Sequence, residues 1–382
     1  MTHTKNQGSV SIQAKGKIRY AVVGLGWIAQ EDVLPAFATK CENSELIAFI
    51  SEDPTKIEAL SQKYGVQHSY SYNEFEKCLN SGEIDAVYIA LPNHLHCEYT
   101  VRAAKAGIHV LCEKPMAVTE EECEQMIRAA RDNNIKLMIA YRLHFDKANM
   151  EAVEIAQSGQ LGDVRIFNSV FTQQVVEGNV RMEKIAVGGG TVYDMGVYCI
   201  NAVRYLFQDE PTEVFAVSAN NGEKRFEQID EMTSAILKFP GERLATFTSS
   251  FGTAPVSTFQ IVGSQGDMRM DSAYSYQGEL KQQITINGQT QERSFPAGDQ
   301  FAAEITYFSD CLLTDKDPEP SGVEGLADIR IIQAIYQSAR TGQPVQLGEF
   351  KRQQRPTAAQ VIQRAATQPP ELIHAADPSG KS

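Results

Sequence analysis

The sequence predicts an α/β protein in which a doubly wound parallel sheet is followed by a second α/β domain with a large, mostly antiparallel open sheet. Up to about Arg142, strand-like and helix-like segments alternate, which is typical of parallel strands joined by crossover helices. A glycine-rich turn, Gly24-Leu25-Gly26-Trp27-Ile28-Ala29, joins the first buried strand to a helix. Beyond Pro211, strand-like runs follow one another without helices, and this pattern predicts an antiparallel meander.

The composition is that of a globular protein large enough for two domains. The chain has 382 residues, of which 42% are hydrophobic and 22% charged. A net charge of −13 argues against binding to nucleic acid or to an anionic membrane. The seven cysteines are scattered and form no CxxC pair, which favours reduced thiols and gives no metal site. Residues 1–16 carry no secretory signal and no apolar run is long enough to span a membrane, so we expect a cytoplasmic protein.

We divide the chain into four parts: a flexible polar arm at residues 1–16, the doubly wound domain at 17–142, a domain for substrate binding and oligomerisation at 143–350, and a tail at 351–382. The tail is rich in Gln, Pro, Ala and Ser, which predicts mobility. In the first domain we expect strands at residues 18–23, 46–50, 85–91, 108–112 and 136–140, and helices at residues 29–40, 54–64, 72–80, 95–106 and 119–133. In the second we expect helices at residues 145–158, 191–207, 301–313 and 322–339, and strands at residues 164–172, 213–219, 233–239, 244–251, 258–262 and 268–270.

The glycine-rich turn predicts a Rossmann dinucleotide-binding site. Gly24 permits the tight turn, Gly26 lets the backbone approach a pyrophosphate, and Ala29 lets the helix pack close to the strand. The N-terminus of that helix attracts the anion, and we expect Trp27 and Ile28 to contact the cofactor as well. An ordinary strand-to-helix turn is the alternative interpretation.

The end of the second strand bears on the choice between NAD and NADP. Ser51 can bond a 2′-phosphate and Lys56 can supply a positive charge, whereas Glu52 and Asp53 favour the free 2′-hydroxyl of NAD. The balance favours NADP, with NAD as the alternative. Ser51 and Asp53 also fit plain helix capping ahead of Pro54.

Three candidate cofactor contacts follow the strand at residues 85–91. Leu91, Asn93 and His96 come where the carboxyl end of a parallel strand borders the cofactor crevice. Asn93, or a neighbour, can instead cap the next helix.

The pair Glu113 and Lys114 follows the strand at residues 108–112 and precedes Pro115, which stops the strand. A lysine at the carboxyl end of a buried strand, beside a nucleotide site, is placed for chemistry. The alternative is an exposed lysine at a strand end.

A polar stripe lies on the helix expected at residues 191–207. Asp194, Tyr198 and Asn201 are spaced i, i+4 and i+7 and therefore share one face. We expect this face to wall the site, with Tyr198 near Lys114 and moving the proton that alcohol oxidation requires. A solvated helix face is the alternative.

With these motifs, the chain resembles the glucose–fructose oxidoreductase/inositol dehydrogenase (Gfo/Idh/MocA) family over about residues 17–350. The resemblance rests on the glycine turn, on Pro92-Asn93-His94-Leu95-His96, on Glu113-Lys114-Pro115, and on Gly188-Gly189-Gly190 with Asp194-Met195-Gly196-Val197-Tyr198. It implies a Rossmann domain followed by an α/β domain whose open sheet packs against another subunit, in a homodimer or homotetramer. Tyr198 looks most like the glucose–fructose oxidoreductase branch, which implies NADP, action at C1 of pyranose sugars, and a catalytic lysine and tyrosine at Lys114 and Tyr198.

The sequence therefore predicts an NAD(P)-dependent oxidoreductase that transfers hydride between nicotinamide and a sugar carbon, expected to be C1. Lys114, Tyr198 and Asp194 are the expected catalytic groups and also contact the sugar. Tyr141 and Arg142, at the domain junction, are further substrate contacts, and Arg142 also borders the cofactor. The alternatives are action at another sugar or polyol carbon, and a non-catalytic regulator that senses dinucleotides on the same fold.

Overall fold

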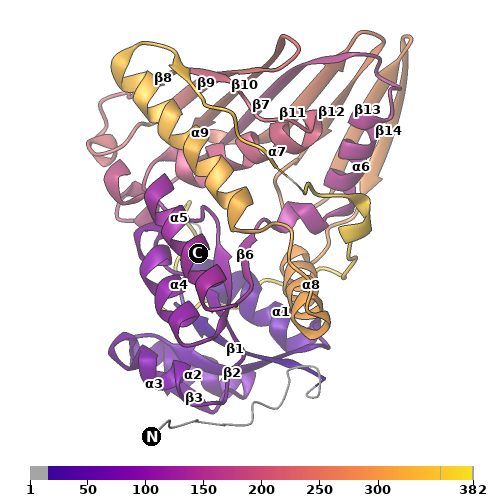
Figure 1. Ribbon diagram of the computed structural model, residues 1–382. Coiled ribbons are helices and arrows are strands. Elements are labelled where there is room, and N and C mark those ends of the chain that lie inside the picture. The colour runs from indigo at the N-terminus through magenta and orange to yellow at the C-terminus, as the bar shows by residue number, and fades with distance from the viewer. Residues whose placement is uncertain (1–15, 353, 381–382) are drawn as a thin grey trace, which may run out of the picture.

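The computed structural model describes residues 16–352 and 354–380 and contains two sheets, with helix α9 running past both (Figure 1). The predicted arm, residues 1–16, lies outside the described residues except for Gly16. The chain passes from the first sheet to the second near Arg142, where a 3₁₀ turn (Arg142–Phe145) follows the last strand of the first sheet.

Six parallel strands form the first sheet in the order β3-β2-β1-β4-β5-β6, which is the order of a Rossmann domain. The strands are β1 (Ile18–Val23), β2 (Ser44–Ile50), β3 (His68–Tyr70), β4 (Ala86–Ile89), β5 (His109–Glu113) and β6 (Leu137–Ala140). The helices are α1 (Leu34–Thr39), α2 (Pro54–Tyr64), α3 (Phe75–Leu79), α4 (His96–Lys105) and α5 (Glu120–Asp132). Short π or 3₁₀ turns precede three of them, at Ala29–Val33, Tyr72–Glu74 and Asn93–Leu95. The predicted doubly wound parallel sheet is confirmed.

Local signals define the helix ends in this domain. The Asp53 side chain accepts the backbone N–H groups of Thr55 and Lys56 at the start of α2, which ends at Gly65 with φ +69°. Thr119 and Glu122 form the predicted capping box at the start of α5. Strand β3 has only three residues and was not predicted.

Nine strands form the second sheet in the order β14-β13-β12-β11-β7-β10-β9-β8-β15. Strands β7 and β10 run parallel, and the other recorded pairs are antiparallel. The strands are β7 (Val164–Gln174), β8 (Glu213–Ala219), β9 (Met232–Phe239), β10 (Arg243–Ser250), β11 (Gly252–Gly263), β12 (Gly266–Asp271), β13 (Leu280–Ile286), β14 (Gln289–Phe295) and β15 (Val345–Gln346). The predicted open, mostly antiparallel sheet is confirmed, and it extends beyond the predicted meander by β13 and β14.

Four helices precede, interrupt or follow the strands of this sheet along the chain. They are α6 (Lys147–Gln157), α7 (Val197–Phe207), α8 (Gln300–Thr314) and α9 (Gly322–Thr341), and a π turn (Val192–Gly196) leads into α7. The expected single helix over residues 191–207 is therefore part π turn and part α-helix.

One face of the second sheet is covered by helices and the other is open. Helices α6, α7 and α9 pack on the covered face (Figure 1), where Phe167 and Phe247 are buried. Large apolar side chains alternate with them and point the other way: Ile166 (43% exposed), Val217 (57%), Ile236 (45%) and Leu244 (48%). Such a row is a surface suited to association.

Helix α8 belongs to the second part of the chain but packs on the first sheet. Its Phe308 is fully buried in one apolar cluster with Tyr20 and Val22 of β1. The Ser309 and Tyr20 hydroxyl oxygens are 2.8 Å apart. The Rossmann core is therefore completed by a late segment of the chain.

The tail, for which the composition predicts mobility, is packed in the structure between residues 354 and 380. Arg355 donates to the Glu210 carboxylate at 3.0 Å, and Gln360 is buried. The backbone of Ile373 exchanges two hydrogen bonds with the side chain of Gln30. The polar tail is thus held by residues of both domains. Amino-acid composition cannot predict such long-range partners.

No helix in the described part of the chain is both long and apolar enough to cross a membrane. All seven cysteines are buried with free thiols.

Candidate active site

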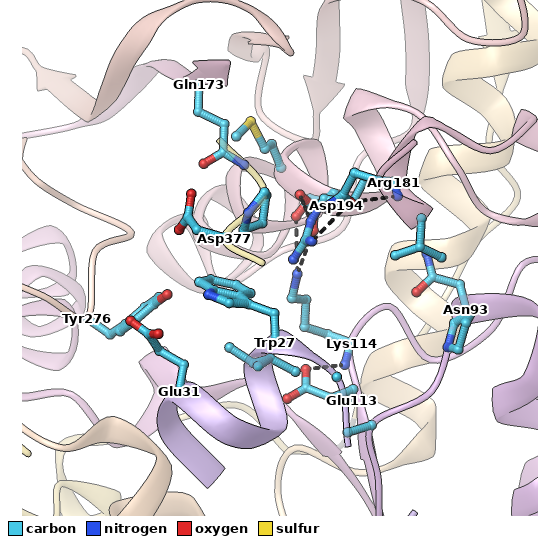
Figure 2. Close-up of a pocket in the computed structure, with 18 of the residues that line it drawn as sticks. Trp27, Glu31, Asn93, Glu113, Lys114, Gln173, Arg181, Asp194, Tyr276 and Asp377 are labelled. Atoms are coloured by element: carbon cyan, nitrogen blue, oxygen red, sulfur yellow. Dashed lines mark hydrogen bonds and ion pairs between the residues drawn. The ribbon is translucent and has the colours of Figure 1, made fainter. Parts of the chain in front are cut away.

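A cavity of about 1040 Å³ lies where the carboxyl ends of the first sheet's strands face the second sheet (Figure 2). This is the position at which ligands bind to open α/β sheets. Most of the residues predicted for the site line the cavity: Gly24, Gly26, Trp27, Ile28, Ser51, Lys56, Leu91, Asn93, Glu113, Lys114, Arg142, Asp194 and Tyr198.

The glycine turn has the geometry that a dinucleotide requires. Gly24 has φ +95°, and a Cβ at this position would lie 2.5 Å from the Ala90 carbonyl oxygen, so only glycine fits. A Cβ on Gly26 would meet no atom within 4 Å, because this backbone faces the open cavity. The residues present therefore fit the diphosphate of a nicotinamide dinucleotide.

Ser51, Lys56 and Tyr72 line the part of the cavity next to β2. Glu52 is absent from the lining, and its carboxylate accepts the backbone N–H of Tyr72 at 2.8 Å. The Ser51 hydroxyl accepts the backbone N–H of Asp53 at 3.2 Å. Ser51 therefore supports the turn before α2 and also lines the cavity. Both carboxylates that argued against NADP are therefore engaged by backbone N–H groups, Glu52 at Tyr72 and Asp53 at the start of α2, and Lys56 supplies the positive charge here.

Lys114 and Arg181 both bind the Asp194 carboxylate (Figure 2). The Lys114 Nζ atom lies 3.3 Å from Asp194 Oδ1, and Arg181 Nε donates to Asp194 Oδ2 at 2.9 Å. Burial opposes the charged form of Lys114, but Tyr198 and Asp194 outweigh it, so the pKa of Lys114 lies above its ordinary value. Burial also opposes ionisation of Asp194, yet the two cations outweigh it and lower the pKa of Asp194. The cavity wall therefore carries a fixed ammonium group at neutral pH.

Tyr198 lies between two cations. The Lys114 Nζ atom is 4.7 Å from the centre of the Tyr198 ring, and the Arg142 guanidinium carbon is 5.0 Å from it. Arg142 Nη2 donates to the Tyr198 hydroxyl oxygen at 3.1 Å. Since the guanidinium has only donors, the proton of the Tyr198 hydroxyl is not used in this bond and is available to a ligand.

Arg142 is itself held rigidly beneath the site. It is 4% exposed, donates to the Tyr274 carbonyl oxygen at 2.7 Å, and also donates to the Gln300 side chain. The structure therefore makes Arg142 the direct partner of Tyr198, while Lys114 contacts the ring.

Glu113 lines the cavity and forms a buried acidic pair with Glu304. The Tyr88 hydroxyl lies 2.8 Å from Glu113 Oε1 and 3.1 Å from Glu304 Oε1 on helix α8. Burial raises the pKa of Glu113 against the opposing charge of Lys114, and burial together with Glu113 raises the pKa of Glu304 well above its ordinary value.

The triple glycine shapes the cavity wall beside the loop that follows β4. A Cβ on Gly189 would overlap the Glu183 carbonyl, and Gly188 has φ +86°, so both positions require glycine. Asn93 Nδ2 donates to the Gly188 carbonyl oxygen at 2.7 Å. Asn93 thus ties the loop after β4 to the turn before α7, and it does not cap a helix.

Three predicted positions lie outside this cavity. His96 is fully buried, and its ring nitrogens contact the carbonyl oxygens of Leu91 and Pro115, so it fastens two loops together instead of bordering the cofactor. Tyr141 borders only a separate hollow of about 10 Å³ behind Lys114 and Tyr198, and so it does not contact the substrate space.

Asn201 is the third predicted position that lies outside the cavity. Its side chain donates to Glu324 and Asp328 of α9 and contacts His144, inside a buried polar cluster. The polar stripe on α7 therefore divides: Asp194 and Tyr198 face the cavity, and Asn201 serves the packing of α7 on α9.

Several cavity residues were not predicted, among them Arg181, Tyr276 and residues 374–378 of the tail. Arg181 lies in the irregular segment between β7 and α7, where no periodicity marks a functional position. The tail residues are separated from the glycine turn by most of the chain, so no local pattern links them.

Comparisons with known proteins agree with this geometry. The family model described as "Oxidoreductase family, NAD-binding Rossmann fold" matches residues 18–141, and that of the "GFO/IDH/MocA C-terminal domain" matches residues 150–269. The D-xylose 1-dehydrogenase (NADP(+)) of Haloarcula marismortui is 32% identical over 337 residues, which cover 86% of this chain and 93% of that protein.

Solved structures extend the similarity to the whole fold. The aldose-aldose oxidoreductase from Caulobacter crescentus, complexed with glycerol, has 37% identity and a TM-score of 0.82, and the match covers 87% of this chain and all of that one. A 3-ketoreductase from Actinomadura kijaniata, in complex with NADP and TDP-benzene, has 26% identity and a TM-score of 0.77, over 84% of this chain and 98% of that one. The chain therefore belongs to the Gfo/Idh/MocA family of oxidoreductases.

Proposed function

We propose that this protein is an NADP-dependent sugar oxidoreductase that transfers hydride between nicotinamide and C1 of a pyranose. The observation that carries the proposal is the convergence of Lys114 and Tyr198 on one cavity with the glycine turn. The NADP-dependent xylose 1-dehydrogenase and the aldose-aldose oxidoreductase among the relatives support a sugar substrate.

The cofactor residues divide the cavity into two ends. The backbone of Gly24 and Gly26 holds the diphosphate, and Ser51 with Lys56 holds the 2′-phosphate. Asn93 and Glu113 line the end near Lys114, where the nicotinamide half belongs. When bound, the cofactor supplies or accepts the hydride.

The proton is handled by the protein. In reduction, Tyr198 gives its hydroxyl proton to the sugar oxygen, since that proton is not used in the bond from Arg142. In oxidation, the phenolate form of Tyr198, with Arg142 and Lys114 beside it, takes the proton of the sugar hydroxyl. The Lys114 ammonium binds the reacting oxygen and stabilises its negative charge, and Asp194 holds that ammonium in place. Asp194 is thus a positioning residue in this proposal.

The experiment uses aldoses that carry deuterium at C1. With xylose or glucose labelled in this way and NADP⁺, we expect deuterium in the reduced cofactor by mass spectrometry and an aldonic acid as the final product. Lys114→Ala should abolish this transfer, whereas Lys105→Ala, an exposed lysine on α4, should not. Turnover without deuterium transfer would assign the reaction to another carbon.

Action at another carbon is the second candidate. It is supported by the 3-ketoreductase of Actinomadura kijaniata and by the dTDP-3,4-didehydro-2,6-dideoxy-alpha-D-glucose 3-reductase of Saccharopolyspora spinosa, which is 29% identical over 334 residues. The labelled sugars decide between the two. Absence of turnover with all aldoses and ketoses tested, despite cofactor binding, would favour a dinucleotide-sensing regulator.

We also propose that the open face of the second sheet binds a second copy of the chain. The support is the row of exposed apolar side chains formed by Ile166, Val217, Ile236 and Leu244. Sedimentation at micromolar concentration should give a dimer or tetramer, and Ile236→Lys should give monomers. A monomeric parent protein contradicts the proposal.

A further inference from the structure

The segment from Ile373 to Pro378, here called the strap, crosses the candidate active site. Residues 374–378 line the cavity together with the glycine turn. In the view of Figure 2, Asp377 of the strap is drawn between Trp27 of the glycine turn and Gln173 of β7, and all three line the cavity. The strap thus covers a cavity whose other walls are built from residues far earlier in the chain.

One end of the strap is fastened to the cofactor-binding helix. Gln30 accepts the Ile373 N–H at 2.8 Å and donates to the Ile373 carbonyl oxygen at 2.9 Å. The same Gln30 amide donates to the Leu25 carbonyl oxygen at 3.0 Å, inside the glycine turn. Gln30 is 1% exposed, so these bonds are shielded from water. The strap is therefore fixed, through Gln30, to the turn that fits the diphosphate.

The next residue lies at the 2′-phosphate end. His374 Nδ1 lies 3.1 Å from Asp53 Oδ2, and His374 lines the cavity together with Ser51 and Lys56. Its φ of +46° is in the left-handed region, which turns the chain at this point.

The other end of the strap is fastened to the second domain. The Val176 N–H donates to the Pro378 carbonyl oxygen at 3.0 Å, just after β7. Pro378 is buried against this site. The strap is thus anchored on one domain at Ile373 and on the other at Pro378, with the cavity between the two anchors.

We propose that the strap is part of the cofactor site and closes over the bound dinucleotide, so that the dinucleotide leaves only when the strap detaches. The inference rests on the proposed function, because it requires a dinucleotide on the glycine turn and at Lys56. A ligand in that position lies between the Gln30 helix and the strap. Its exit requires the hydrogen bonds at Gln30 and Val176 to break, and this step limits the dissociation rate.

The test measures the dissociation rate of NADPH from the full chain. Enzyme loaded with NADPH is mixed with excess NADP⁺ in a stopped-flow instrument, and the nicotinamide fluorescence is followed. One variant ends at Pro370 and lacks the strap. A second, Ile373→Pro, removes the N–H that Gln30 accepts and leaves the bond from Gln30 to Leu25 in place. Glu371→Ala, an exposed position two residues before the strap, is the control.

We expect NADPH to dissociate at least about tenfold faster from both strap variants, because the truncated chain lacks the strap and Ile373→Pro loses one of the two shielded hydrogen bonds that hold it at Gln30. The control should keep the parental rate, and matching thermal unfolding midpoints establish that the variants are folded. Dissociation from both folded variants within twofold of the parental rate overturns the inference, while the parent still binds and turns over. A parent that binds neither NADPH nor NADH overturns the proposed function, and the inference with it.

Discussion

At the scale of single residues, the two groups assigned to the chemistry have separate supports. Lys114 is held by the carboxylate of Asp194, and the hydroxyl of Tyr198 is held by Arg142. A change at one group therefore leaves the partner of the other in place. Because of this separation, each role can be tested by a single substitution.

Tyr198→Phe removes the hydroxyl and keeps the ring between Lys114 and Arg142. If Tyr198 moves the proton, hydride transfer should slow by about 10²–10⁴-fold. Cofactor affinity should stay within a few-fold of the parental value, since the hydroxyl faces the sugar. Single-turnover absorbance of the nicotinamide measures the first quantity and calorimetric titration the second. Tyr64→Phe, on α2 outside the cavity lining, is the control, and a parental rate in Tyr198→Phe would make Tyr198 a packing residue.

Lys56→Ala removes the cation beside Ser51. A charge-assisted bond to a phosphate should be lost, so we expect NADP⁺ to bind on the order of tenfold more weakly and NAD⁺ to bind unchanged. Titration calorimetry with both cofactors gives the ratio of the two dissociation constants. Lys63→Ala, exposed on the same helix, controls for the change in net charge. Equal weakening of both cofactors would place the 2′-phosphate elsewhere.

The sequence predicts best those site residues whose position follows from a strand end. Gly24, Lys114 and Asn93 follow β1, β5 and β4, so the topology alone brings them together. The same argument is wrong for His96, because a buried polar ring at a strand end serves equally well to tie two loops. Arg181 was beyond prediction, because its position depends on an irregular segment.

At the scale of elements, helix α8 brings a second carboxyl group, that of Glu304, close to the cavity residue Glu113. The Tyr88 hydroxyl has one proton and lies within hydrogen-bonding distance of both Glu113 and Glu304. It can donate to only one of them, so the other contact is satisfied when that carboxyl group carries a proton of its own. The pKa of Glu304 is raised further than that of Glu113, which lies next to the Lys114 ammonium, so we expect Glu304 to hold the proton.

Glu304→Gln mimics the protonated form and should change how stability depends on pH. An unfolded glutamate releases its proton near pH 4.3, whereas folded Glu304 keeps it because its pKa is raised. Above that pH the folded state binds more protons, so the parent's free energy of unfolding falls as pH rises, by up to about 1.4 kcal/mol per pH unit. The variant lacks this loss and should gain stability relative to the parent towards alkaline pH.

Urea unfolding across the neutral range measures this difference. Glu58→Gln, exposed on α2, should keep the parental pH dependence. Parallel curves for the parent and Glu304→Gln would mean that Glu304 is ionised in the folded protein.

Elements with strong local signals were predicted closely, and those without were not. Helix α2 runs from Pro54 to Tyr64 as predicted, because Asp53, Pro54 and Gly65 mark its ends. Strands β13 and β14 were missed because Gln282 takes a buried position in β13 and β14 is exposed or half-buried along its whole length, so neither shows an apolar alternation. These strands exist because neighbouring strands satisfy their backbone groups.

At the scale of the whole molecule, the two domains do not have separate cores. Helix α8 buries Phe308 against Tyr20 and Val22, so without α8 these apolar side chains of the first sheet would be exposed. We expect the isolated fragment of residues 17–142 to show no cooperative thermal transition by circular dichroism and to bind a hydrophobic dye. The full chain should unfold cooperatively under the same conditions. A fragment that melts at the parental temperature would establish an independent first domain.

The position of α8 also has a consequence for synthesis of the protein. Tyr20 and its partner Ser309 are 289 positions apart in the chain. At about 5–20 residues per second, roughly 15 to 60 seconds separate their emergence from the ribosome. During this interval the apolar surface around β1 is already translated and still lacks its cover. The nascent first domain therefore exposes apolar surface that a chaperone can bind, and its folding is completed only after α8 has emerged.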